Sequence, residues 1–172
     1  QRQMCIRDSP YSMEEMVARK FILGEQPDAI IDIVDATNLE RNLYLTMQLL
    51  ELERPVVLAV NFMDEVEKKG DVIDCGRLAA SLGVPVVPIS ARDNVNIDRL
   101  VQEAHKQMHT GLTVEPDDLY DDFTHAIHHR ISELIHDRAY EKGIPAHWAA
   151  IKLLGGDGEV AKDLALDQAV LD

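Results

Sequence analysis

Three short runs of apolar and β-branched residues divide the first two thirds of the chain, and helical patterns lie between them. The runs cover residues 29–35, 55–60 and 84–90. Each is bounded by Pro, Gly, Asn or Asp, which favours strands over helices. Apolar positions at helical spacing predict helices over 13–23, 39–52, 74–82 and 97–109.

This alternation of helices and strands is typical of a parallel, doubly wound sheet. Parallel strands are joined by right-handed crossovers, and strands that are apolar on both faces fit a sheet that is covered on both sides. In such sheets ligands bind outside the carboxyl ends of the strands. The positions to inspect are therefore Asp35, residues 61–64 and residues 90–92.

The pattern changes after Gly111. Helical spacing predicts a long helix to about residue 140, a second helix over 146–154 and a third over 159–170, without another strand pattern. We therefore expect an α/β part, an incomplete doubly wound sheet, over 10–112 and a partial helical domain over 113–172. Residues 1–9 fit neither pattern, and we expect them to be foreign to the domain or disordered.

The composition excludes several classes of partner. The formal net charge is −14 and acidic residues occur in both regions, which argues against nucleic acid, because phosphate binding requires a basic footprint. No apolar run approaches the roughly 18–20 residues of a membrane span, and no signal peptide pattern is present. We expect the chain taken alone to be soluble. Its two cysteines, Cys5 and Cys75, have no metal or redox spacing and indicate a reducing compartment.

The second predicted strand ends in Asn61-Phe62-Met63-Asp64. A carboxylate accepts two parallel hydrogen bonds, so Asp64 suits the ring imino and exocyclic amino hydrogens of guanine, a pair that adenine lacks. Asn61 would tie the base edge to a neighbouring loop. Because an unpaired buried polar group is costly, such a site discriminates between bases. An isolated Asn-x-x-Asp also occurs by chance, as a turn or a helix cap.

The next predicted strand ends in Ser90-Ala91-Arg92. The backbone N–H of Ala91 would approach the guanine carbonyl oxygen, and Ser90 would hold the turn. The two strand ends together look like the last two base-recognition motifs of a GTPase. Arg92 either lines the base pocket or is solvated. Common GTPases have Lys after the Asn, where Phe62 could supply equivalent stacking area, and we expect Met63 to pack beside the base.

The most specific stretch of the chain is DATNLERNLYL, residues 35–45. It resembles the ferrous iron transport protein B family, a bacterial iron-uptake GTPase, as do PYSMEEMVAR at 10–19 and WAAIKLL at 148–154. The resemblance covers nearly everything after residue 9. It implies a cytosolic GTPase domain, a helical domain that favours retention of GDP, and a membrane permease further along the same polypeptide. Residues 10–19 would follow the second switch of the family.

The resemblance also implies ligands and a location. GTP or GDP is the expected ligand, with Mg²⁺ in the intact parent, at the cytoplasmic face of the bacterial inner membrane. Formation of a homo-oligomer stays open. The predicted function is a fragment of the cytosolic guanine-nucleotide-binding region of a ferrous iron transporter, in which GTP binding and hydrolysis regulate or drive iron uptake. The alternative is a non-catalytic α/β protein-interaction module.

One departure limits the expected activity. No G-x-x-x-x-G-K-[ST] motif occurs in the sequence, and no Asp-x-x-Gly precedes Pro10. The sequence thus lacks the phosphate cradle, its lysine and its hydroxyl for magnesium. We expect no catalytic residue, no metal ligand and no unaided GTP hydrolysis, with at most weak base recognition. A dinucleotide-binding dehydrogenase is disfavoured, because no G-x-G-x-x-G follows any predicted strand.

The remaining candidates have plainer interpretations. Asp35 either faces a nucleotide pocket or caps the following helix, and we favour the cap. The histidines invite a metal site, but nothing in the sequence fixes carboxylates to converge with them. We therefore expect solvated helix histidines at positions His105, His109, His125, His128, His129 and His136.

Overall fold

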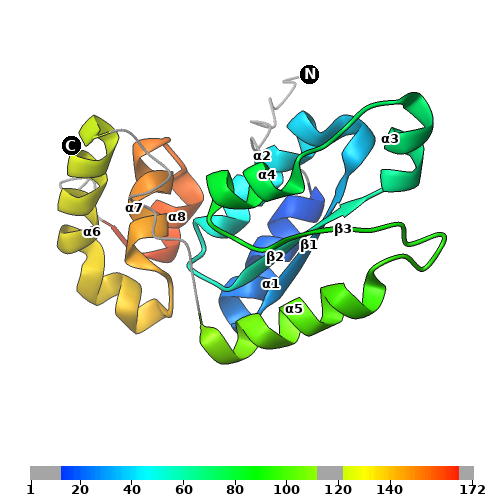
Figure 1. Ribbon diagram of the computed structural model, residues 1–172. Coiled ribbons are helices and arrows are strands. Elements are labelled where there is room, and N and C mark those ends of the chain that lie inside the picture. Colours follow the sequence, from blue (N-terminus) through cyan, green and yellow to red (C-terminus); the bar gives the residue numbers. More distant parts are fainter. Residues whose placement is uncertain (1–12, 112–121, 167–172) are drawn as a thin grey trace, which may run out of the picture.

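The structure is a computed structural model, which describes residues 13–111 and 122–166. Figure 1 shows a sheet with surrounding helices beside a separate group of helices. The α/β part contains, in order, α1 (Met13–Glu25), β1 (Ile30–Asp35), a 3₁₀ turn (Ala36–Asn38), α2 (Leu39–Leu50), β2 (Val56–Asn61), α3 (Met63–Lys69), α4 (Cys75–Leu82), β3 (Val86–Pro88) and α5 (Ile97–Thr110). The expectation for residues 1–9 lies outside the described residues.

The three strands form one parallel sheet in the order β1-β2-β3. The register pairs Asp35 with Asn61 and Val60 with Pro88, so the carboxyl ends of neighbouring strands reach the same edge. The prediction of a parallel α/β fold from the strand pattern is therefore confirmed. The edge at which a ligand was expected carries the polar residues that the sequence singled out.

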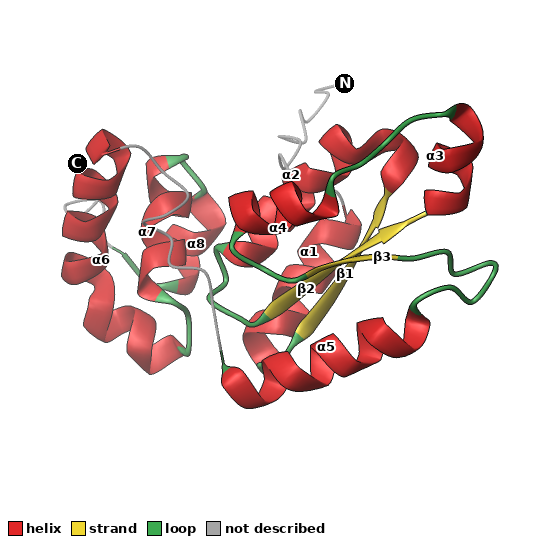
Figure 2. Cartoon of the chain, in the orientation of Figure 1, coloured by secondary structure: helices red, strands yellow, loops and turns green. Residues whose placement is uncertain are grey.

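Helices cover the two faces of the sheet differently (Figure 2). On one face Leu58 and Val60 belong to a core shared with α2 and α4. On the other, Val57 and Ala59 pack with residues of α5. Burying a Val or Leu side chain of this kind contributes roughly 1.5–3 kcal/mol.

The outer strand departs from the prediction that both faces are covered. Ile31 and Ile33 lie on the α5 side of β1 and are 42% and 61% exposed. The reason is the position of α5, which packs against β2 and β3. The prediction is therefore wrong for β1 within the described part of the chain.

The helix α3 was not predicted. It is only seven residues long and buries a single apolar side chain, Val66, so it leaves little periodic signal. It ends at Gly70, which adopts a left-handed conformation with φ +80°. Such a C-terminal residue is usually glycine, because a side chain would be strained there. The helix matters for the site because it carries Asp64.

The helical group consists of α6 (Asp122–Lys142), α7 (Ala146–Leu154) and α8 (Gly158–Asp163). The predicted start of the first helix lies outside the described residues. The third helix is shorter than predicted, because Ala165 has a left-handed backbone with φ 50°. Trp148 and Ile135 belong to the same apolar core as Leu49 and Leu52 of the α/β part. The helical group therefore packs on the α/β part through a continuous core.

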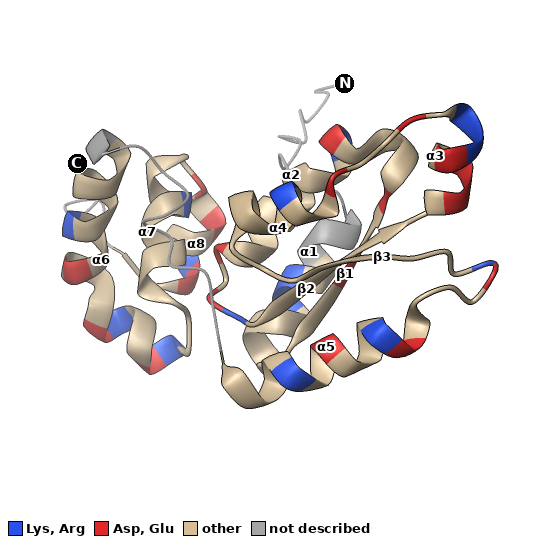
Figure 3. Ribbon diagram, in the orientation of Figure 1, with Lys and Arg blue, Asp and Glu red and all other residues tan. Residues whose placement is uncertain are grey.

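Charged residues are interspersed over both parts. In the view of Figure 3, acidic and basic residues alternate along α5 and occur together on α6. Among the described helices, none is long and apolar enough to cross a membrane.

Candidate functional site

The candidate site lies at the carboxyl ends of β2 and β3. Asn61 is the last residue of β2, and its side-chain oxygen accepts a hydrogen bond of 3.0 Å from the backbone N–H of Ala91. The backbone N–H of Met63 donates to the carbonyl of Ile89 at 3.3 Å. The sequence placed these strand ends side by side, and the structure joins them by direct hydrogen bonds. Asn61 thus ties β2 to the turn that follows β3.

Asp64 lies beside the same turn. The hydroxyl of Ser90, which is buried, is 3.1 Å from Asp64 Oδ1 and 3.2 Å from Asp93 Oδ2. A hydroxyl has one hydrogen and therefore donates to one of these carboxylates at a time. It also accepts the backbone N–H of Asp93 at 3.3 Å. Ser90 therefore holds the turn, as the sequence suggested, and Asp93 is a neighbour that the sequence analysis missed.

The carboxylate of Asp64 is held in its ionised form. Lys68, one helical turn away, donates to Asp64 Oδ2 at 3.1 Å and lowers the pKa of Asp64 below its ordinary value of 3.8. The hydrogen bond from Ser90 and the charge of Arg92 also lower this pKa, against a desolvation that raises it. An ionised carboxylate accepts hydrogen bonds only. This is the state that a pair of donors on a base edge requires.

Phe62 has an unusual backbone. It adopts the left-handed conformation with φ 65° and ψ 28° and precedes α3 as its N-terminal flanking residue. This region costs a side-chain-bearing residue roughly 1–2 kcal/mol, and such strain often accompanies functional positions. Phe62 is 39% exposed, so part of this residue is accessible at the strand end. Met63 instead packs against the core, and its predicted place beside the base stays a prediction.

Two expectations for the motif Ser90-Ala91-Arg92 require refinement. The N–H of Ala91 already donates to Asn61, so a carbonyl oxygen of a base would share or replace this bond. The Arg92 side chain is largely exposed, and its guanidinium lies 3.8 Å from Asp93 Oδ1. Arg92 therefore contributes charge near Asp64, whereas Asn61, Asp64, Ser90 and Ala91 form the bonded unit.

The turn after β3 is shaped by residues that the sequence analysis did not consider. Ser90 and Val95 form an isolated antiparallel bridge, with N···O distances of 2.9 and 3.3 Å. Asn94 and Asn96 have left-handed backbones, with φ 55° and 60°. The side chain of Asn96 donates to the carbonyl of Pro88 at 2.8 Å. Two asparagines in a short loop are a signal for such conformations, because Asn tolerates the left-handed region.

Asp35 caps the turn that follows β1. Its carboxylate accepts the backbone N–H of Thr37 at 2.8 Å and the Thr37 hydroxyl at 2.7 Å. These bonds agree with the favoured interpretation as a cap, although the capped element is the 3₁₀ turn that leads into α2.

One cavity lies at the opposite end of β1. A cavity of about 750 Å³ is lined by apolar residues of α1 and by the start of β1, including Phe21 and Ile30. It therefore lies at the amino end of the strand and offers little chemistry. Burial raises the pKa of the Cys75 thiol, which disfavours the reactive thiolate.

One of the histidines differs from the expectation of solvated side chains, whereas His105, His109 and His136 are exposed. His105 and His109 are exposed on α5, with their Nε2 atoms 3.2 Å apart. His128 is fully buried, so the expectation of a solvated side chain is wrong for this residue. It faces α7, where its ring lies 5.4 Å from that of His147, which the sequence analysis did not consider.

The parallel sheet and the helical group that follows it place the chain in the class of P-loop GTPase-like folds. A family model described as ferrous iron transport protein B matches residues 6–104, and one described as the FeoB cytosolic helical domain matches residues 120–172. The chain belongs to the ferrous iron transport protein B family.

Curated relatives agree with this assignment. A Fe(2+) transport protein A/Fe(2+) transporter FeoB fusion protein of Porphyromonas gingivalis is 36% identical over 159 residues, which cover 88% of this chain and 18% of the relative. The Fe(2+) transporter FeoB of Escherichia coli (strain K12) is 45% identical over 92 residues, 54% of this chain and 12% of the relative. The chain thus spans less than a fifth of the length of these relatives.

Solved structures share the fold. The NFeoB from S. thermophilus bound to GDP.AlF4- and K+ superposes with a TM-score of 0.84 at 39% identity and covers 95% of this chain and 63% of its own. The mGMPPNP-bound NFeoB from S. thermophilus gives a TM-score of 0.82 at 40% identity, with coverages of 95% and 60%. The apo cytosolic domain of the T. maritima FeoB gives 0.73 at 26% identity, with coverages of 90% and 60%.

Proposed function

We propose that this chain supplies guanine recognition and helical coupling to the cytosolic region of a bacterial ferrous iron transporter, in which GTP binding and hydrolysis regulate or drive iron uptake. The observation that carries the proposal is the bonded unit of Asn61, Asp64, Ser90 and Ala91 at two adjacent strand ends. The relatives described as bound to mGMPPNP and to GDP.AlF4- support it.

In this proposal the two oxygens of Asp64 accept the imino and amino hydrogens of guanine. Lys68 and Ser90 bond these oxygens in the present structure, and each oxygen has a second lone pair for a base donor. Phe62, which is partly accessible, offers its ring as stacking surface for the base. The sequence contains no phosphate-loop motif, so we assign no phosphate or magnesium contact to its residues.

The coupling part of the proposal rests on Arg19. This residue of α1 bonds Asp157 at 3.1 Å, and its guanidinium lies 5.0 Å from the centre of the Trp148 ring. Asp157 in turn caps α8 by accepting the backbone N–H groups of Glu159 and Val160. A movement of α1 would therefore displace Arg19 and change its contacts with both α7 and α8. We propose that the nucleotide state of the parent biases the helical group through this contact.

Nuclear magnetic resonance of the chain tests base recognition directly, because it detects weak binding. Addition of GDP should shift the amide signals of residues 61–64 and 90–92, whereas equal ADP should leave them in place. Asp64→Asn should lose the response to GDP and gain one to xanthosine diphosphate, since xanthine has a carbonyl where guanine has an amino group. Asp35→Asn is the matched control, because Asp35 ends the neighbouring strand and caps a turn.

A chimera strengthens the test. The upstream part of the S. thermophilus NFeoB, joined ahead of residue 13, would supply phosphate contacts and raise the affinity. Equal responses to GDP and ADP in both the chain and the chimera, or an Asp64→Asn variant that still selects guanine, would contradict the proposal.

A further inference from the structure

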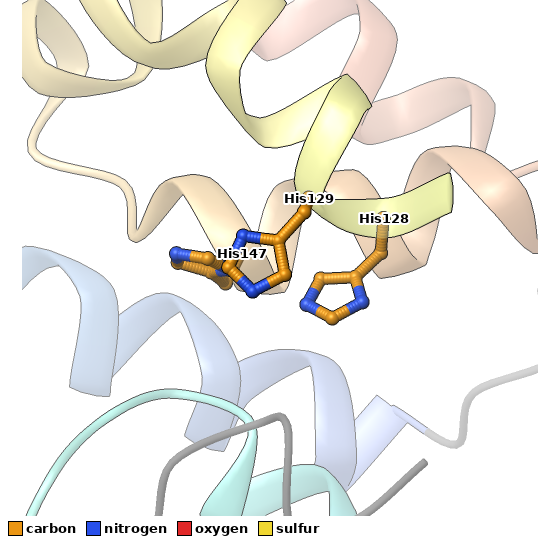
Figure 4. Close-up of side chains that lie close together, drawn as sticks. All are labelled: His128, His129 and His147. Atoms are coloured by element: carbon orange, nitrogen blue, oxygen red, sulfur yellow. The ribbon is translucent and has the colours of Figure 1, made fainter. Parts of the chain in front are cut away.

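Three histidines form a cluster between α6 and α7. One ring nitrogen from each of His128, His129 and His147 lies within 4.8 Å of the others. The ring centroids are 4.8 Å apart for His128 and His129, 4.8 Å for His129 and His147, and 5.4 Å for His128 and His147. Figure 4 shows the rings gathered on one side of the two helices. We propose that these three imidazoles bind a divalent transition-metal ion.

The hydrogen bonding of His128 prepares it as a ligand. Its Nδ1 lies 3.2 Å from the backbone carbonyl of Thr124, which can only accept, so Nδ1 carries the hydrogen. The lone pair of the neutral ring is then on Nε2. Metal-bound histidines commonly donate their other ring N–H to a backbone carbonyl or a carboxylate, which fixes the tautomer and the ring orientation. His128 has this arrangement and is fully buried.

The spacing requires only small movements. Three nitrogens at most 4.8 Å apart lie no more than about 2.8 Å from a common centre, whereas zinc–imidazole bonds measure about 2.0–2.1 Å, so each nitrogen moves inward by at most roughly 0.7 Å. Rotations about side-chain torsions supply such shifts. His129 and His147 are only partly buried, and their rings have room to adjust.

The ligand set selects the class of metal. Neutral imidazoles suit Zn²⁺, Co²⁺, Ni²⁺, Cu²⁺ and Fe²⁺, whereas Mg²⁺ and Ca²⁺ take oxygen ligands. A cavity of about 490 Å³ is lined by His129 and His147 together with Glu53, Glu133 and Asp137. A water molecule or one of these carboxylates can complete the coordination from this cavity. The three-histidine set therefore leaves a position open on the cavity side.

The location gives the metal a structural consequence. Glu53 belongs to the α/β part and lies two residues after Glu51, whose carboxylate bonds Lys152 of α7 at 2.6 Å. The cavity thus adjoins the contact between the two parts of the molecule. A metal that links α6 to α7 would stabilise the helical group at this junction, because an ion that binds only the folded state raises its stability.

A second pair of histidines must be removed from the experiment. His105 and His109 lie four residues apart on α5 with their Nε2 atoms 3.2 Å apart, and they could chelate a metal at the surface. The measurement therefore uses the chain without a histidine tag in a His105→Gln/His109→Gln background. Cobalt(II) serves as the probe, because its visible absorption reports the coordination number.

Cobalt titration of this background should give one ion per chain with the intense visible absorption of a four-coordinate site. An excess of Mg²⁺ should not displace it. Either His129→Gln or His147→Gln should weaken binding at least about tenfold. His136→Gln is the matched control, since His136 lines the same cavity but lies outside the cluster, and it should leave binding unchanged. Cobalt should raise the melting temperature in the background and fail to do so in His129→Gln/His147→Gln.

Nuclear magnetic resonance of the cobalt-bound protein tests the proposal without any cluster variant, so the result does not depend on whether such a variant folds. In the unvaried background, cobalt should shift the ring signals of three histidines far outside the diamagnetic range. Far-ultraviolet circular dichroism without metal checks that each variant retains its helices. Failure to bind cobalt in the background, binding unaffected by both His129→Gln and His147→Gln, or shifted signals from fewer than three rings would overturn the proposal.

Discussion

The polar contacts at the strand ends differ from those at the junction between the α/β part and the helical group. At the strand ends Lys68 bonds Asp64 with a side chain that is 63% exposed. At the junction Lys152 bonds Glu51 with both side chains only 10% exposed. Both are lysine–carboxylate pairs, but water screens only the first. The exposed pair can exchange partners with a ligand, whereas the buried pair must stay closed.

The two regions also differ in sequence separation. Asp64 and Ser90 are 26 residues apart and Asn61 and Ala91 are 30 apart, each within one strand–helix–strand unit. Glu51 and Lys152 are 101 residues apart, and Arg19 and Asp157 are 138 apart. The strand-end contacts follow from the topology of the sheet, whereas the junction depends on how two regions far apart in the sequence pack together.

Among these predictions, removal of the buried Lys152 charge should have the largest effect on the free energy of unfolding. Lys152→Met takes away the charge 2.6 Å from Glu51 and should reduce the free energy of unfolding by about 3–5 kcal/mol. Urea unfolding followed by the fluorescence of Trp148 measures it, because this sole tryptophan is buried at the junction.

The matched control for this pair removes both charges. Glu51→Met/Lys152→Met should recover most of the lost stability, since an apolar pair avoids a buried charge. A single variant that loses less than about 1 kcal/mol would show that the junction behaves like the exposed pair at the strand ends.

A buried polar contact inside the α/β part should have an intermediate effect. The hydroxyl of Thr46 in α2 donates to Asp32 of β1 at 2.6 Å, and both residues are buried. Thr46→Val should cost about 1.5–3 kcal/mol of unfolding free energy, because it removes a donor to a buried carboxyl. Thermal and urea unfolding of the variant and the parent chain measure this cost.

The pH dependence of Asp32 has a defined sign. Burial raises the pKa of Asp32 above its ordinary value of 3.8, and the Thr46 hydrogen bond partly opposes this. The folded state then holds the proton more tightly, so this group reduces stability as the pH rises above 3.8. Asp32→Asn retains an acceptor for Thr46 and should stabilise the protein at pH 7, with a gain that disappears below about pH 3.8. A gain that persists at low pH would contradict the assignment.

The strained residue at the strand end should have a smaller effect on stability. Phe62→Gly and Phe62→Ala both remove the ring, but only glycine adopts φ 65° without strain. The glycine variant should therefore be more stable than the alanine variant by about 1 kcal/mol in urea unfolding. Both should show the same weakened amide response to GDP, because both lack the stacking ring. Equal stability of the two variants would argue that the position is unstrained.

The sequence predicted the parts of the fold that depend on local periodicity. The three strands, α1, α2, α4 and α5 recur at the expected places because each has a repeated apolar face or a glycine terminator. The helix α3 escaped prediction because it buries only Val66. The exposure of one face of β1 was not predicted, because this face, with Ile31 and Ile33, is as apolar as that of a fully covered strand.

The sequence predicted the candidate strand-end site better than the junction. Asn61, Asp64 and Ser90 lie in short motifs at strand ends, so the fold brings them together. His147 was not considered, because its approach to His128 depends on the angle between α6 and α7. Such contacts arise from tertiary packing and leave no periodic signal in the chain. The contribution of these packing contacts to stability depends on how deeply they are buried, and the sequence does not specify that burial.

The smallest effect is expected at the exposed pair. Lys68→Met removes the main cause that lowers the pKa of Asp64, so this pKa should rise while the fold stays intact. A carbon-13 titration of the Asp64 carboxyl measures it. Lys69→Met is the matched control, since Lys69 is the next residue of α3 and the Asp64 bond comes from Lys68. The response to GDP should change less than about twofold, because exposed ion pairs are weak and exchange easily with other partners. A strongly impaired response would mean that Lys68 positions Asp64, and the contrast between an exchangeable strand end and a fixed junction would not hold.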